Sequence, residues 1–226
     1  MSPLSGPSED MKKRRYLSFL LLIMLSIGCN SRNDSDATTN GQAPSPDGSE
    51  IQRYSEKVVK DTLLLSMTTE ILDVIKEEDL QGLAEYFHPE MGVRFSPYGY
   101  IDTVHHVHFS REEFIKQLEE GDSLLWGMYD GTGTDIYMSV DGYFDKFVYE
   151  VDFLNAEEFS VNEILGTGNS LINIDQVYPG ADFTESYFSG FEEKYGGMDW
   201  RSLRLVFKAE EEQLYLVGIV HDQWTI

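Results

Sequence analysis

The side chains best suited to hold a ligand are polar or aromatic residues embedded in apolar stretches of the chain. Arginine and tryptophan in such positions can hold a carboxylate or a sugar through charge and stacking. The other interpretation is structural, with each arginine paired to an acid and each tryptophan filling space. The candidate ligand-binding residues are Arg94, Tyr98, Trp126, Arg201, His221 and Trp224.

Histidine offers a second kind of chemistry, because three of the five histidines fall within four positions. On a strand over 104–109, His106 and His108 share one face and His105 lies on the other. Two imidazoles and a carboxylate could bind zinc or copper. No third ligand stands at a diagnostic spacing, so we expect a polar strand and no metal.

The chain lacks the motifs of several large enzyme classes. It contains no Gly-x-Ser-x-Gly elbow, phosphate-binding Gly-x-x-x-x-Gly-Lys, His-Glu-x-x-His or Cys-x-x-Cys. Asp130–Asp135 resembles a calcium loop, but threonines occupy the alternate positions, which favours a tight glycine-rich turn. No catalytic residue, metal or cofactor is predicted.

Acid–base catalysis needs no such motif and stays open as an alternative. A hydrolase or isomerase could use His221 or His88 together with an acid such as Asp152 or Asp222. Neighbouring residues on a strand face opposite ways, so His221 and Asp222 are not expected to pair with each other.

Composition limits the partners that the chain can have. It has 226 residues, with 17 Lys and Arg against 40 Asp and Glu, for a net charge of −23. Hydrophobic residues make up 41% and aromatics 13%, too many for a disordered acidic tail. The negative charge argues against nucleic acid, and against an anionic lipid surface as the main partner. One domain of good size is expected.

The first 30 residues have the parts of a secretory signal. Four cations, Lys12–Arg15, precede an apolar run from Leu17 to Ile27 that closes on Gly28 and Cys29. A run of this length is too short for a bilayer span, which needs about 20 residues. The reading frame could begin at Met1 or at Met11.

The segment Leu25-Ser26-Ile27-Gly28-Cys29 resembles the lipobox of bacterial lipoproteins, although Ser26 stands where leucine is usual. The resemblance implies that residues 1–28 are removed and that Cys29 is lipidated, as with palmitate. Cys29 is the single cysteine, so no intramolecular disulfide can form. We expect a lipid-anchored protein on the extracytoplasmic side of the cell membrane, touching the membrane through its anchor alone. Its mature chain would carry 13 cations and 38 acids.

The rest of the chain divides into a tether and one domain. Residues 29–50 are rich in Ser, Asn, Asp, Gly and Pro and contain no Leu, Ile, Val or aromatic residue, so they are predicted to be a disordered tether. Periodic apolar residues continue from Ile51 to Ile226 without a second linker. A single α+β domain, 51–226, is predicted.

Helices are predicted in the first part of this domain. Apolar residues recur at three- and four-residue steps over 50–75, as Val59, Leu63, Met67, Ile71 and Val74. Further helices are predicted at Asp79–Phe87 with Asp79 as N-cap, at 110–120 with a Ser110–Glu113 capping box and Gly121 as its stop, and at Ser139–Phe147.

Strands are predicted elsewhere, at 92–96, 124–128, 148–154, 170–175 and 182–189. The clearest is a closing hairpin of strands 200–209 and 213–224, central to the sheet because the second strand is apolar on both faces. Strict alternation places Leu216 with Val220, and Val217 with Ile219 and His221. His221 is then expected near an open mouth, and Gly218 at a bend or close approach.

The segment IKEEDLQGLAEYFHP (75–89) and the long terminal hairpin resemble the nuclear-transport-factor-2-like superfamily. That resemblance implies N-terminal helices packed on a curved antiparallel sheet, a cone-like, cystatin-like architecture whose concave face can line a pocket. Residues 88–100 and 198–226 also resemble an uncharacterised group of bacterial lipoproteins. The cone fold hosts isomerases, dehydratases and binding modules, so it does not select a function.

The function expected from these patterns is an extracytoplasmic lipoprotein that binds a small molecule or a cell-envelope component without catalysis. Two alternatives stay open, namely the acid–base enzyme and a structural envelope protein with a filled core. The absence of catalytic motifs favours binding over the enzyme, and strands rich in Arg, Tyr and Trp favour it over the structural protein.

Overall fold

The structure, a computed structural model, describes residues 48–211 and 213–225. The predicted signal segment, Cys29 and nearly all of the predicted tether therefore lie outside the described residues. Among those residues, no helix is both long and apolar enough to span a bilayer.

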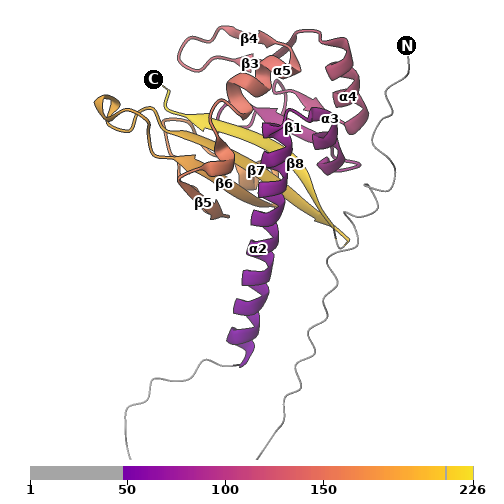
Figure 1. Cartoon of the computed structure of the whole chain (residues 1–226), viewed down its shortest axis with the longest axis vertical. Coiled ribbons are helices and arrows are strands. Elements are labelled where there is room, and N and C mark those ends of the chain that lie inside the picture. Colours follow the sequence, from indigo (N-terminus) through magenta and orange to yellow (C-terminus); the bar gives the residue numbers. More distant parts are fainter. Residues whose placement is uncertain (1–47, 212, 226) are drawn as a thin grey trace, which may run out of the picture. The chain divides into compact units, whose positions relative to one another are not determined.

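The described chain is a mixed α and β structure built on one six-stranded, mostly antiparallel sheet (Figure 1). The strand order is β2-β1-β8-β7-β6-β5, and every neighbouring pair is antiparallel except β1 and β8. The prediction of helices combined with an antiparallel sheet is confirmed for most of the sheet, but the parallel pairing of β1 with β8 was not predicted. The strands of this sheet are β1 (Val93–Ser96), β2 (His108–Phe109), β5 (Glu158–Val161), β6 (Asp182–Phe188), β7 (Arg201–Glu210) and β8 (Gln213–Gln223).

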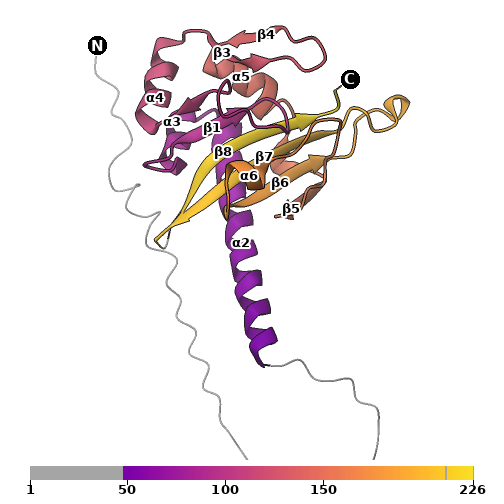
Figure 2. The ribbon, with the colours of Figure 1, turned by 180° about the vertical axis from the view of Figure 1, so that it is seen from behind.

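Helix α2 (Gly48–Lys76) crosses one face of the sheet, and the short helix α6 (Ile174–Val177) lies on the other (Figures 1 and 2). The buried side of α2 belongs to its second half, where Leu64, Ile71 and Ile75 are almost inaccessible. The helix is confirmed, but its predicted apolar stripe is wrong in the first half, because Val59 and Leu63 are exposed.

The predicted helix caps are present because each depends on residues close together in the chain. Asp79 accepts a hydrogen bond from the Gly82 N–H at the start of α3 (Leu80–Leu83). Ser110 and Glu113 form the predicted capping box of α4 (Arg111–Glu120), which ends at Gly121 in a left-handed conformation. Ser139 caps α5 (Val140–Tyr143), which continues as a π-helix over Phe144–Val148.

Two predicted strands are wrong. Residues 148–154 contain the end of the π-helix and most of a 3-10 turn, Phe153–Asn155. Residues 170–173 are irregular, and α6 begins at Ile174. In both segments a buried apolar side chain, Phe153 or Ile174, begins a short helical turn, and its spacing from other apolar residues imitates a two-residue period. Residues 104–106 likewise lie in a turn, so β2 is shorter than the predicted strand.

Short strands without a strong pattern went unpredicted. Strand β3 (Leu124–Met128), which the sequence does predict, pairs with the unpredicted β4 (Asp135–Met138) in a separate two-stranded sheet. The edge strand β5, also unpredicted, has two exposed residues out of four. The loop between β3 and β4 holds Gly131 and Gly133 at positive φ, which is the expected glycine-rich turn.

The closing hairpin lies in the middle of the sheet, as predicted, but it contains a bulge that the pattern did not reveal. Val206 pairs with Gly218 while the next residue, Phe207, pairs with Leu216, so Val217 is the extra residue. The bulge changes which residues share a face. Leu216 and Ile219 pack in one core, and Val217 and Val220 pack in the other.

The predicted alternation in β8 is therefore wrong beyond Leu216, and His221 lies on the face opposite Val217. Gly218 does mark a close approach, as expected. A Cβ atom at Gly218 would lie 3.2 Å from the hydroxyl of Tyr178, which itself donates to the backbone oxygen of Val217.

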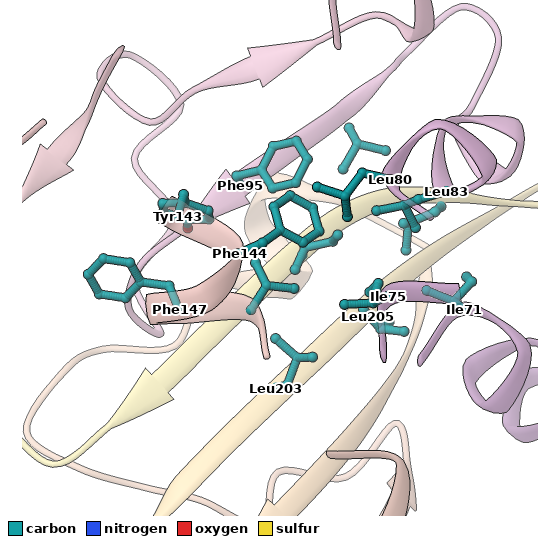
Figure 3. Close-up of a cluster of buried hydrophobic side chains, with 14 of the residues drawn as sticks. Ile71, Ile75, Leu80, Leu83, Phe95, Tyr143, Phe144, Phe147, Leu203 and Leu205 are labelled. Atoms are coloured by element: carbon teal, nitrogen blue, oxygen red, sulfur yellow. The ribbon is translucent and has the colours of Figure 1, made fainter. Parts of the chain in front are cut away.

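Two apolar cores hold the layers together. The larger lies between the sheet and α2, and Figure 3 shows its side chains meeting from α2, α3, β1, the π-helix and β7. Phe95 is at its aromatic centre, with its ring 5.8 Å from those of Phe114, Trp126 and Phe144. The smaller core lies on the opposite face beneath α6 and contains Phe183 and Val206.

Candidate functional site

Three of the predicted site residues come together at the end of the sheet where β7 begins and β8 ends. His221 Nε2 lies 2.7 Å from Glu150 Oε1, and Arg201 Nε approaches the same oxygen at 2.7 Å. Tyr98 joins the group through Phe147, whose ring contacts both Tyr98 and His221. Sequence analysis missed Glu150, because the π-helix that delivers it is not visible as a pattern.

The carboxylate of Glu150 is the common partner of Arg201 and His221 at this site. Burial acts to raise the pKa of Glu150, but the hydrogen bond and charge of His221, followed by Arg201, outweigh burial and leave the pKa below its ordinary value. The Glu150 side chain is 21% exposed and that of Arg201 is 24% exposed, whereas His221 is 1% exposed. Solvent therefore reaches the carboxylate and the guanidinium but not the imidazole.

Both nitrogens of His221 are engaged within the protein. Nδ1 lies 2.8 Å from the backbone oxygen of Pro97, and Nε2 faces Glu150. Both partners, the Pro97 oxygen and the Glu150 carboxylate, are hydrogen-bond acceptors, and each of them faces one ring nitrogen. Neither nitrogen is then free to take a proton from a ligand. The expected position of His221 at an open mouth is wrong, since the bulge in β8 turns it into the core.

Tyr98 and Trp126 are both buried. Trp126 is fully inaccessible, stacks on Tyr143 with ring centroids 3.9 Å apart, and donates from Nε1 to the Met138 oxygen. The Tyr98 hydroxyl accepts from the backbone N–H of Asp130, and burial raises its pKa. These are the space-filling and hydrogen-bonding roles of core aromatics.

Arg94 and Trp224 lie apart from this cluster. Arg94 pairs in register with Gly218 and donates from Nη1 to the His106 oxygen at 2.8 Å. Its guanidinium also contacts the Tyr178 hydroxyl, on the α6 side of the sheet. Trp224 follows the last strand and is 37% exposed. The six predicted ligand-binding residues therefore do not line one common pocket.

The clustered histidines do not converge on one point. His106 is half-buried, its Nδ1 accepts from the Asp102 N–H and lies 2.9 Å from the Ser96 hydroxyl, and burial lowers its pKa to about 4. His108 Nε2 contacts the Met91 oxygen instead. Within residues 48–211 and 213–225, no three His, Cys, Asp or Glu side chains gather as a metal site.

The remaining residues of the acid–base alternative are also separated. His88 Nδ1 accepts from two backbone N–H groups, those of Glu90 and Met91. Asp152 is bound by the Tyr149 hydroxyl, by Asn155 and by Lys76, which together lower its pKa to about 2. Asp222 faces away from His221, as expected, and burial raises its pKa.

An ion network that the sequence did not reveal surrounds Arg204, in the middle of β7. Its guanidinium lies 2.9 Å from both Glu185 Oε1 and Asp222 Oδ2, and all three side chains are 0–1% exposed. Glu185 also accepts from the backbone N–H groups of Leu165 and Gly166 and from the Ser202 hydroxyl. The network fastens the segment around Gly166 onto the sheet.

The signal for this network was present but incomplete. Arg204 stands between apolar residues of a strand that is predicted to be central, so a buried partner is required. Its partners come from β6 and β8, and their identity depends on strand register.

The surface depressions of the described chain include one at the hairpin turn and one beside α6. One, of about 430 Å³, lies at the hairpin turn beside Glu210, Glu211, Gln213 and Tyr215, away from both cores. The other, of about 340 Å³, is the α6 groove, which lies above the smaller core. The α6 groove is lined by Asn162, Ile164, Ile172, Asn173, Ile174, Asp175, Gln176, Ala181 and Phe183.

The α6 groove combines an apolar floor with polar groups at its rim. Ile174 and Phe183 belong to the smaller core. The Asn173 amide is held by the backbone of Ile101: its Oδ1 accepts from the Ile101 N–H and its Nδ2 donates to the Ile101 oxygen. Asp175 and Gln176 are exposed, and their side chains have no partner among the residues that the structure describes. A small, mainly apolar molecule with one or two polar groups fits these features.

Comparison of the chain with protein families, with curated proteins and with solved structures gave no match.

Proposed function

We propose that this chain is a lipid-anchored, extracytoplasmic binding module that takes a small ligand or a cell-envelope component. The apolar run that ends at Gly28-Cys29 supports the anchor. The α6 groove is the observation that carries the binding role, because its volume lies within the range of small-molecule sites, about 300–1,000 Å³. A cone-like curvature of the sheet is part of the same proposal.

The acid–base alternative has less support than binding. Its best histidine, His221, is buried and holds both ring nitrogens against internal acceptors. His88 uses Nδ1 for its own turn, and its Nε2 lies 3.6 Å from Glu210 Oε2. A general base must instead present a free nitrogen to its substrate.

The anchor is tested with Cys29→Ser in the full chain. Loss of the thiol removes the site of acylation, so the variant should stay uncleaved or move from the detergent phase to the aqueous phase. A variant that is still processed and still partitions with detergent would refute the anchor.

The binding role is tested with Nile red, an uncharged apolar dye that becomes fluorescent in apolar sites. We expect saturable binding of one dye per chain, weakened at least tenfold by Ala181→Phe, because the added ring fills the α6 groove. Ala156→Phe makes the same change at another half-buried alanine outside the groove and should leave binding unchanged. Equal binding by the two variants would show that the groove is not the site.

A further inference from the structure

The first half of α2 extends beyond the sheet and leaves apolar side chains in solvent (Figures 1 and 2). Tyr54 is 71% exposed, Val58 45%, Val59 69% and Leu63 55%. These four residues are called the α2 apolar face below. Single exposed apolar residues are ordinary, but four within ten positions of one helix form a patch.

The α2 apolar face is not an extension of the core. At 3.6 residues per turn, its four members occupy one half of the helix circumference. The charged residues occupy the other half and include Lys57 and Lys60, which precede the buried Leu64 by seven and four positions. Lys60 reaches the sheet and pairs with Asp182 at 2.8 Å. In this first part of α2, the side of the helix that faces the sheet is therefore charged, and the α2 apolar face points away from the sheet.

We propose that the α2 apolar face rests on the lipid surface to which the chain is anchored; this inference depends on the proposed lipidation of Cys29. Nineteen positions separate Cys29 from Gly48, where α2 begins. A random coil of 19 residues would span about 25 Å on average, which is about the length of a helix made of residues 48–63. The anchor therefore holds the start of α2 close to the bilayer.

The chemistry of this segment suits the headgroup boundary of a membrane. Tyrosine and aliphatic side chains on one side with lysine and arginine on the other are typical of helices that lie in the interface plane. The segment also carries balanced charge, with cations at Arg53, Lys57 and Lys60 and acids at Glu50, Glu56 and Asp61. In a chain of net charge −23 it can approach lipid without the repulsion that acts on the acidic remainder.

The experiment places an environment-sensitive probe on each side of the helix. Full-length Val58→Cys and Lys57→Cys chains, lipidated at Cys29, are labelled with NBD and reconstituted in phosphatidylcholine vesicles. We expect blue-shifted emission, at least threefold brighter and quenched by lipid-borne quenchers, at position 58 and not at position 57. Water-like emission at both positions would overturn the proposal. So would disulfide-linked dimers of Val58→Cys, because they would assign the face to a second copy of the chain.

The wild-type chain separates failure of the anchor from failure of the surface. Acylated Cys29 has no free thiol, so wild type should take up no label. Labelling of wild type would refute the anchor. In that case NBD fluorescence is measured on the Cys29→Ser/Val58→Cys chain as the concentration of the same vesicles is raised. A blue shift of the NBD emission from this chain would support the α2 apolar face as a lipid-binding surface without the anchor. Emission that does not shift would overturn the lipid-binding surface.

Discussion

At the scale of single residues, two arginines three positions apart in β7 meet different surroundings. Arg204 is inaccessible to solvent and neutralises Glu185 and Asp222, whereas Arg201 is 24% exposed beside Glu150. In the dry interior a charge loses its hydration and depends on its partners, while at the surface water supplies part of the compensation. An arginine–carboxylate pair is therefore expected to contribute differently to the free energy of unfolding at the two sites.

Replacing Arg204 with Met should lower the free energy of unfolding by about 3–5 kcal/mol, because two carboxylates are left buried without a counter-charge. The matched variant Arg201→Met should cost less, about 1–3 kcal/mol, since Glu150 keeps His221 and some water. Urea denaturation of the two variants measures both values. A smaller loss for Arg204→Met than for Arg201→Met would contradict this account of the network.

The pairing of Glu150 with His221 and Arg201 should make stability depend on pH. The folded-state pKa of Glu150 lies below its unfolded value of about 4.3, so the pair stabilises the fold above that value. The contribution is lost as pH falls through the folded-state pKa. At pH 7, Glu150→Gln should cost about 1–3 kcal/mol, and its difference from wild type should shrink below about pH 4.

Thermal melts of wild type and Glu150→Gln across this pH range measure the difference. The control is Glu158→Gln, a change at an exposed position of β5, which should be neutral throughout. A cost for Glu150→Gln that stays constant down to pH 3 would show that Glu150 acts through packing rather than through its charge.

At the scale of elements, the bulge in β8 decides which residues of the strand face each core. Leu216 and Ile219 face the core under α2, while Val217 and Val220 face the core under α6. Truncating Leu216 or Val217 to Ala should each cost about 1–4 kcal/mol, the range for buried aliphatic side chains. The exposed Val104→Ala should stay within about 0.5 kcal/mol of wild type. Denaturant melts that find all three variants alike would place β8 outside the packed centre.

Helix α2 should contribute to stability through its second half. Ile71→Ala removes a fully buried side chain and should cost about 2–5 kcal/mol. Leu63→Ala removes a side chain of similar size that is 55% exposed, and should change the unfolding free energy by no more than about 0.5 kcal/mol. Urea melts in the absence of lipid make the comparison. A large loss for Leu63→Ala would mean that the α2 apolar face packs within the fold and is not a free surface.

At the scale of the whole molecule, the sequence before α2 and the packed unit after it are expected to act independently. Residues 30–47 contain no large apolar side chain, so they have nothing to bury against the sheet. A chain that begins at Gly48 should melt at the same temperature as one that begins at Asn30. Calorimetry measures the melting temperatures of both chains. A midpoint several degrees lower for the shorter chain would show that residues 30–47 dock on the packed unit.

Local features of this protein were determined by the sequence alone. Asp79, Ser110 and Ser139 cap helices because a hydroxyl or carboxylate oxygen reaches an N–H only three residues ahead. The closing hairpin followed from two long apolar strands joined by a short acidic turn. The mixed α and β class, and the central place of β7 and β8, follow from these elements.

The tertiary structure decided what depends on partners that are distant in the chain. Glu185, Arg204 and Asp222 meet because of strand register, and His221 meets Glu150 because the bulge at Val217 reverses the face it occupies. The parallel pairing of β1 with β8 joins residues more than 100 positions apart. A one-residue slip moves a side chain across the sheet at little local cost, so the packing of both cores, and not the local pattern, selects the register.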